Sequence, residues 1–257
     1  DEDGREVGAG EAAYINGDSI DVTTKASFYF GGPVAGAGVD WSVMASPYRP
    51  PIEGYERYSF SDYDYWRTAV NENPVRATGD ATIGPDGVAS FSVPAALQAS
   101  EGTQRFTISA TVTDSNAQAV ASSTQVTVHA AAVAAGIRPA EYLALTGEPA
   151  EIQLVAVDMD GNTRAGQPIV VRVYERKWIT TKTQTADGAR RYTSEPVDTL
   201  VATLPATSGA DGEATVSYTP AKPGTLRLVA EATDSAGRTA RSATYLWVAG
   251  TEYASWR

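Results

Sequence analysis

The sequence predicts an all-β protein made of two tandem antiparallel β-sandwiches of immunoglobulin or fibronectin type. Three observations predict this fold class. Apolar and polar residues alternate with period two in several stretches, turn sequences rich in Gly, Asp and Asn separate these stretches, and the same order of stretches and turns occurs twice. Alternation buries one face of a sheet and leaves the other in water. The length of 257 residues also fits two domains, because a typical domain has about 100–150 residues.

The strands are expected where the alternation is clearest. Four stretches qualify, namely 105–112, 123–128, 213–218 and 225–230. Hairpin turns are expected where the residues favour tight turns or a left-handed backbone conformation, namely at 85–87, 160–162, 211–212 and 235–237. An Ala-rich stretch at 130–136 is too short to form a stable helix alone.

The duplication gives the domain boundaries. Residues 114–128 align without gaps on 234–248, and 35–43 match 165–173. Each copy is expected to hold about seven strands, and Trp41 lies on the inward side with Val39 and Val43. We predict four segments: a linker or disordered start at 1–11, a first sandwich at 12–130, a second sandwich at 131–250 and a lead into a following domain at 251–257.

Both copies carry a long insertion at the same place. The first, 45–79, is rich in aromatic and acidic residues, whereas the second, 175–198, is more basic. Irregular loops longer than about 12–15 residues are uncommon and are often functional. The aromatic rings of the first insertion either pack against the sandwich or a neighbouring domain, or form a platform for sugars: Tyr48, Tyr55, Tyr58, Phe60, Tyr63, Tyr65 and Trp66.

Composition and motifs argue against most kinds of active site. The net charge of −11 disfavours binding to nucleic acids and to anionic membranes. The sequence has no cysteine, and its one histidine, His129, has no partner motif for catalysis or metal binding. Residues 158–162 resemble a calcium loop, but Thr163 and Ile169 stand where an EF-hand needs Gly and Glu, so a hairpin turn is favoured. We therefore predict a protein that is not an enzyme, with no catalytic, cofactor-binding or metal-binding residues and no cofactor.

Residues 28–43 resemble the opening of a macroglobulin-like domain of the bacterial alpha-2-macroglobulin family. Further stretches extend the resemblance over roughly 11–257: residues 173–178, 195–199, 220–225, 243–248 and 253–257. The resemblance implies two such domains, the third and fourth, which precede the domain with the bait region. It also implies a periplasmic or extracellular parent protein, with or without a membrane anchor elsewhere in its chain.

The resemblance implies a function as well. Members of the family are broad-spectrum protease inhibitors that trap a protease after it cuts the bait segment, and many carry a thioester made from Cys and Gln. This chain has no Cys and cannot hold that thioester. It is expected to be a non-catalytic scaffold segment whose partners are neighbouring macroglobulin-like domains and, through the full-length protein, proteases. The alternative is a cell-surface adhesive or carbohydrate-binding module, which would present coplanar rings between Tyr55 and Trp66 on an open groove.

Overall fold

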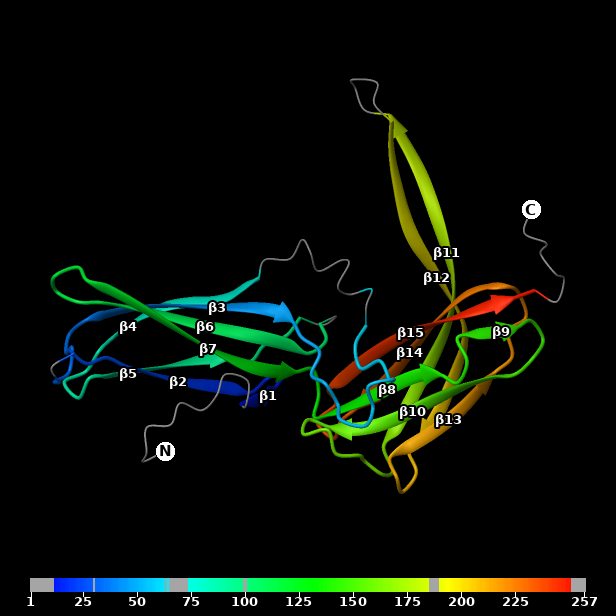
Figure 1. Cartoon of the computed structure of the whole chain (residues 1–257), viewed down its shortest axis with the longest axis horizontal. Coiled ribbons are helices and arrows are strands. Elements are labelled where there is room, and N and C mark those ends of the chain that lie inside the picture. Colours follow the sequence, from blue (N-terminus) through cyan, green and yellow to red (C-terminus); the bar gives the residue numbers. More distant parts are fainter. Residues whose placement is uncertain are drawn as a thin grey trace. The chain divides into compact units, whose positions relative to one another are not determined.

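The computed structural model describes residues 12–29, 31–62, 64, 74–98, 101–184 and 190–250, and its named elements are β-strands (Figure 1). The expected linker at 1–11 and the lead at 251–257 lie outside the described residues. The chain divides into two compact units. The first unit comprises residues 1–50 and 64–132, and the second comprises residues 51–63 and 133–257.

The first unit is a sandwich of a larger and a smaller sheet. Its larger sheet has the strand order β1-β7-β6-β3-β4, and its smaller sheet pairs β2 with β5. The strands are β1 (Ala13–Ile15), β2 (Ser19–Lys25), β3 (Gly38–Pro47), β4 (Val75–Thr82), β5 (Val88–Pro94), β6 (Gln104–Thr113) and β7 (Ala119–His129).

The second unit repeats this plan. Its larger sheet has the order β12-β11-β14-β15-β9, and its smaller sheet has the order β13-β10-β8. The strands are β8 (Val133–Pro139), β9 (Leu143–Leu145), β10 (Ala150–Asp158), β11 (Pro168–Gln184), β12 (Arg190–Thr207), β13 (Glu213–Tyr218), β14 (Gly224–Thr233) and β15 (Thr239–Ala249).

The two larger sheets have the same strand order, which confirms the predicted duplication of one sandwich. Chain positions match one to one, since β1 to β7 correspond to β9 to β15, and β8 is an addition of the second unit. Each unit also departs from the expected purely antiparallel pairing, because its first short strand runs parallel to its last: β1 to β7, and β9 to β15. Residues 133–136 of the Ala-rich stretch form the first part of β8, which pairs antiparallel with β10.

The alternation seen in the sequence builds a separate core in each unit. In the second unit, Ile169, Val171 and Val173 of β11 face Leu226 and Leu228 of β14 in one cluster of buried residues. In the first unit, the matching strands contribute the corresponding positions to the core: Val39, Val43, Phe106 and Ile108. The burial of these residues excludes water from apolar surface, which is the main stabilising contribution to such a fold.

Trp41 has the core position that its parity predicts. Its ring stacks on Phe91 with centroids 4.6 Å apart and an interplanar angle of 5°, and it packs against both buried clusters of the first unit. The indole lies over Gly79, its direct partner on the neighbouring strand β4. Glycine is therefore required at 79, since a Cβ there would lie 2.7 Å from Cε2 of Trp41.

Substituting Gly79→Val is expected to lower the free energy of unfolding of the first unit by about 1–3 kcal/mol, the usual effect of overpacking a core. Urea unfolding followed by tryptophan fluorescence measures this loss. The matched control is Gly38→Val on β3, where an added Cβ meets nothing within 4 Å. A loss at position 38 as large as at position 79 would contradict the steric explanation.

Three hairpin turns use the same aspartate arrangement. One carboxylate oxygen of Asp114 accepts hydrogen bonds from the backbone N–H groups of residues 116 and 118, at 2.8 and 2.9 Å. Asp158 and Asp234 make the equivalent pair of bonds two and four residues further on. These bonds lower the pKa of Asp114, chiefly the bond from Gln118. The residues that resemble a calcium loop, 158–162, thus form the hairpin turn that the sequence favours.

The two insertions differ in structure although they occupy equivalent positions, between β3 and β4 and between β11 and β12. Residues 51–62 of the first insertion form an irregular segment, here called the strap. The second insertion, expected to be a loop, is instead a regular hairpin in which β11 and β12 pair continuously up to Gln184 and Arg190. Its β-branched residues explain this result, since they favour an extended ribbon over an irregular loop.

Candidate functional site on the second unit

The strap belongs to the second unit, although its sequence interrupts the first. It crosses the free edge of β8, where Ser59 and Ile137 exchange two backbone hydrogen bonds of 2.9 and 3.0 Å (Figure 1). Further along, the carbonyl of Ser61 accepts a bond of 3.1 Å from the backbone N–H of Ala243 on β15. The strap therefore makes backbone bonds to a strand of each sheet of the second sandwich.

Phe60 is the apolar anchor of the strap. Its ring lies over Gly136 of β8, so close that an added Cβ at 136 would be 2.5 Å from the ring and 2.8 Å from the side chain of Val155. Neighbouring Leu154 and Ala156 belong to the sandwich core, so Val155 points to the opposite face of β10, and yet it is fully buried. The strap thus covers apolar surface on the outer face of the smaller sheet.

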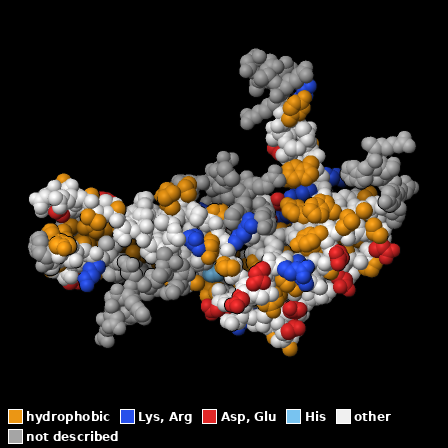
Figure 2. Space-filling model, in the orientation of Figure 1, with side chains coloured by type: hydrophobic (Ala, Val, Ile, Leu, Met, Phe, Trp, Pro, Cys, Tyr) orange, Lys and Arg blue, Asp and Glu red, His pale blue; other side chains and the backbone are white. Residues whose placement is uncertain are grey.

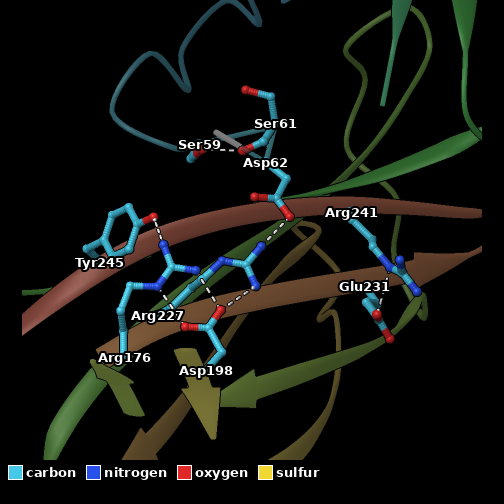
Figure 3. A network of polar contacts seen from close by, with 9 residues as sticks. All are labelled: Ser59, Ser61, Asp62, Arg176, Asp198, Arg227, Glu231, Arg241 and Tyr245. Atoms are coloured by element: carbon cyan, nitrogen blue, oxygen red, sulfur yellow. Dashed lines mark hydrogen bonds and ion pairs between the residues drawn. The ribbon is translucent and has the colours of Figure 1, made fainter. Parts of the chain in front are cut away.

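Asp62 joins the strap to a network of charged residues (Figure 3). Its carboxylate pairs with the guanidinium of Arg227 on β14, and Arg227 also lies 3.6 Å from Asp198 on β12. Asp198 in turn forms a bidentate pair with Arg176 on β11, at 2.6 and 2.5 Å. We call Asp62, Arg176, Asp198, Arg227 and Tyr245 the charge network.

Arg176 is the most deeply buried member of the charge network, with 7% of its surface exposed. Its third contact is a hydrogen bond of 2.7 Å from Nη1 to the hydroxyl of Tyr245 on β15. The network contains two guanidinium groups and two carboxylates, so its formal charge is balanced. Balanced charge with bidentate geometry is what allows such groups to be buried. The network can hold strands and strap together, but it contains no nucleophile paired with a general base.

The rings of the strap do not form a coplanar platform. Tyr55 and Tyr58 are half-buried and meet edge to face, with centroids 5.6 Å apart and planes at 71°. The ring of Tyr58 lies against the guanidinium of Arg138, 5.0 Å away. Burial and the nearby carboxylate of Glu213 raise the pKa of Tyr55. Of the other predicted rings, Tyr48 packs on Arg105 in the first unit, whereas Tyr63, Tyr65 and Trp66 lie outside the described residues.

The end of the β11–β12 hairpin carries several large apolar side chains that are exposed. We define the arm as residues 177–184 and 190–197, beyond Arg176, where pairing of β11 with β14 ends. Figure 2 shows apolar and basic side chains along it, and Trp178, Ile179 and Tyr192 are 47–62% exposed. Lys182 lies over the ring of Tyr192 on the opposite strand. Side chains at 183–191, including the predicted basic residues Arg190 and Arg191, lie outside the described ones.

The remaining residues singled out by the sequence have structural positions. His129 ends β7, and its carbonyl accepts a bond of 2.8 Å from Asn16. Among the described residues, no group of three or more His, Cys, Asp or Glu side chains is arranged to hold a metal ion. The same part of the chain contains no helix with the length and hydropathy needed to cross a membrane.

Sequence reasoning missed the charge network and the site of the strap. One available signal was the position of Arg176 and Asp198, which lie directly opposite each other when residues 175–198 are paired as a hairpin. Another was the apolar run 154–157 in β10, since a strand that is apolar on both sides is covered on both faces.

Comparison with protein-family models matches both units. Residues 6–129 match the model described as the bacterial alpha-2-macroglobulin MG5 domain, and residues 136–248 match the one described as bacterial macroglobulin domain 6. The expected ordinal numbers, third and fourth, are therefore corrected to fifth and sixth. The reason for the error is that alternation and turns recur in every sandwich of this kind, so they carry no information on position in the parent chain.

Solved structures share the fold. The native conformation of E. coli alpha-2-macroglobulin matches with a TM-score of 0.65 and 17% identity over 93% of this chain and 15% of that one. Salmonella alpha-2-macroglobulin reacted with methylamine gives a TM-score of 0.64 and 16% identity over 94% of this chain and 16% of that one. The E. coli protein activated by porcine elastase gives 0.65 and 17%, over 95% and 21%. The chain thus spans about a sixth of the first two proteins, and comparison with curated protein sequences found no match.

Proposed function

Because the chain belongs to the bacterial alpha-2-macroglobulin family and comprises two adjacent macroglobulin-like domains, we propose that it is part of a protein that traps proteases. In this proposal the parent protein is cut in a bait segment by a protease, rearranges and encloses the protease. The two units are part of the framework that holds the bait and surrounds the captured enzyme. We assign them no catalytic or cofactor-binding role, and we place the domain bounds at 12–130 and 131–250, with the parent protein in the periplasm or outside the cell.

One observation carries this proposal: two family models for consecutive macroglobulin domains match in order along nearly the whole chain. The physical character of the units supports it. Each has its own buried core, and a framework needs modules that keep their shape when load is applied. The exposed rings of the arm support contact with neighbouring domains of the same parent chain, because contiguous exposed apolar surface commonly marks an interface.

The carbohydrate-binding alternative receives no support from the described rings. A sugar platform needs coplanar rings on an open groove, whereas the rings of Tyr55 and Tyr58 meet edge to face at 71° and are half-buried. Phe60 faces Gly136 rather than solvent.

The test uses the parent protein mixed with trypsin. Trapped trypsin is expected to keep its activity on a small chromogenic substrate and to lose most of its activity on a large protein substrate, because enclosure blocks only large molecules. Equal activity on both substrates, with or without the parent protein, would overturn trapping. A parent protein whose bait segment has been replaced by a sequence without Lys or Arg is the control, since trypsin then has no bait to cut.

The arm is expected to be the first place in the second unit that trypsin cuts. Lys177 and Lys182 are exposed on a ribbon of two strands, and an isolated two-stranded ribbon is only marginally stable in water. Arg172 lies within the same β11 strand but is paired on both sides, with β12 and β14. Limited digestion with mass spectrometry is expected to show cuts within 177–191 well before cuts at Arg172. No early cut within 175–198 would end the idea that this insertion is accessible to proteases.

A further inference from the structure

We propose that the neighbouring edges of β8 and β15 form a binding site for an extended peptide, and that the strap is its resident ligand. A peptide with the same pattern, an aromatic residue followed two positions later by an acid, can take its place. The inference concerns the second unit itself and does not depend on protease trapping.

Both edges carry backbone groups that no other described strand uses, and these groups can bond to a ligand. β8 is the last strand of its sheet and pairs only with β10 among the described strands. β15 is covered by β9 only at Trp247–Ala249, which leaves the edge at Ala243 open to another segment. Free strand edges recruit extended segments because their N–H and C=O groups need partners. The hydroxyl of Ser242 donates to the carbonyl of Ala135, so the two edges are already held next to each other.

The strap satisfies these groups as a bound peptide would. The N–H and carbonyl of Ile137 bond to Ser59, and the N–H of Ala243 bonds to Ser61. Residues 59–62 therefore provide the part of the ligand that bonds to the two edges, with a β-bridge at Ser59 and a bend at Ser61. Residues 52–58 fold on themselves through two turns, closed by bonds of 3.0 Å from Tyr55 to Ile52 and 2.9 Å from Tyr58 to Tyr55.

Two side chains of the strap give the site its specificity. Phe60 fills the space over Gly136, where the lack of a Cβ lets the ring approach the backbone and reach Val155. Asp62 pairs with Arg227, whose side chain is only 13% exposed. The chain bends at Ser61 between these two residues, so that the ring reaches Gly136 and the carboxylate reaches Arg227. The site thus selects an aromatic ring and a carboxylate at this spacing.

The strap is a covalent part of the chain but not of either sheet. It joins the second unit from the sequence of the first, and its bonds to β8 form an isolated bridge rather than a ladder. Such local contacts open with a smaller free energy than the strands of the core. The strap is for this reason exchangeable, whereas a strand within the ladder is not.

The first experiment measures amide hydrogen exchange by NMR in the full chain. In the variant Phe60→Ala, Asp62→Asn, the amides of Ile137 and Ala243 are expected to exchange about tenfold faster than in the wild type. Without its two anchors the strap detaches more often, and its backbone carbonyls at 59 and 61 then no longer accept bonds from these amides. The amide of Val229, on the central strand β14, serves as the control and is expected to keep its protection. Unchanged protection at Ile137 and Ala243 would overturn the role of the two anchors.

The second experiment supplies the ligand in trans as a fluorescein-labelled synthetic peptide of residues 50–62. Saturable binding, seen as a rise in anisotropy, is expected with the double variant and much weaker binding with the wild type, whose site is occupied by its own strap. Binding is expected to restore slow exchange at Ile137 and Ala243. The matched control is the same peptide carrying both substitutions, which is expected not to bind.

Each outcome decides the proposal. Equal binding to wild type and variant would mean that the peptide binds elsewhere, and faster exchange without peptide binding would mean that the edges do not form a site for a free ligand. If the double variant also loses protection at Val229, its fold has changed. The single variant Asp62→Asn, which keeps the apolar anchor, then decides the question by the same two measurements.

Discussion

Substituting Asp198→Ala is expected to lower the free energy of unfolding of the second unit by about 3–5 kcal/mol, the usual result of removing one member of a buried ion pair. Asp198 is the centre of the charge network, because it accepts two hydrogen bonds from Arg176 and lies 3.6 Å from Arg227. Its removal takes away the carboxylate that makes two bonds to the guanidinium of Arg176, whose side chain is 3% exposed. Since domains are stable by only about 5–15 kcal/mol, this loss is a large fraction of the total.

Urea unfolding of the full chain, with amide exchange at β14 to identify the second unit, measures this effect. Glu195→Ala on the arm is the matched control, because Glu195 is exposed and its loss is expected to cost less than about 0.5 kcal/mol. The double variant Arg176→Met, Asp198→Leu is expected to recover most of the stability, since replacing a whole buried pair by apolar groups is often neutral. Equal effects of Asp198→Ala and Glu195→Ala would show that the network adds no stability.

Substituting Leu228→Ala is expected to destabilise the second unit by about 2–5 kcal/mol through the loss of buried apolar surface and the cavity left behind. Leu228 is fully buried at the centre of β14, where it is paired on one side with Val173 of β11 and on the other with Thr244 of β15. The neighbouring side chains are held by two ladders and cannot close the gap.

The control for this prediction is Leu200→Ala on β12, because Leu200 is 49% exposed and the same atoms are removed. Its effect is expected to stay within about 0.5 kcal/mol. Chemical denaturation of both variants under identical conditions compares the two values. A loss of stability at Leu200 similar to that at Leu228 would mean that the surface of β12 around Leu200 is covered in solution. A small loss at Leu228 would contradict its assignment to the core.

The fold class followed from local chemistry. Alternation at 105–112 and 225–230 predicted β6 and β14, and the turn residues at 235–237 predicted the hairpin between β14 and β15. The turn at Asp211-Gly212 was expected to form a hairpin as well, but it joins β12 and β13, which belong to different sheets. The duplication was predicted because the same order of alternating stretches and turns occurs twice in the sequence. These signals depend only on residues that are close in sequence, so the sequence alone is enough to predict the structure that they specify.

The position of the strap and the burial of Arg176 were decided only by the tertiary structure. In the sequence, Phe60 and Asp62 belong to the first insertion, and no nearby residue indicates that Gly136 and Arg227, which are far away along the chain, contact them. The same holds for Arg176, which sequence alone places on an exposed basic loop and which Asp198 and Tyr245 allow to be buried. A charged side chain is buried, or a loop held, only where partners from distant strands supply the opposite charge and the matching shape. Folding brings those partners together from distant parts of the chain, so local sequence patterns do not identify them.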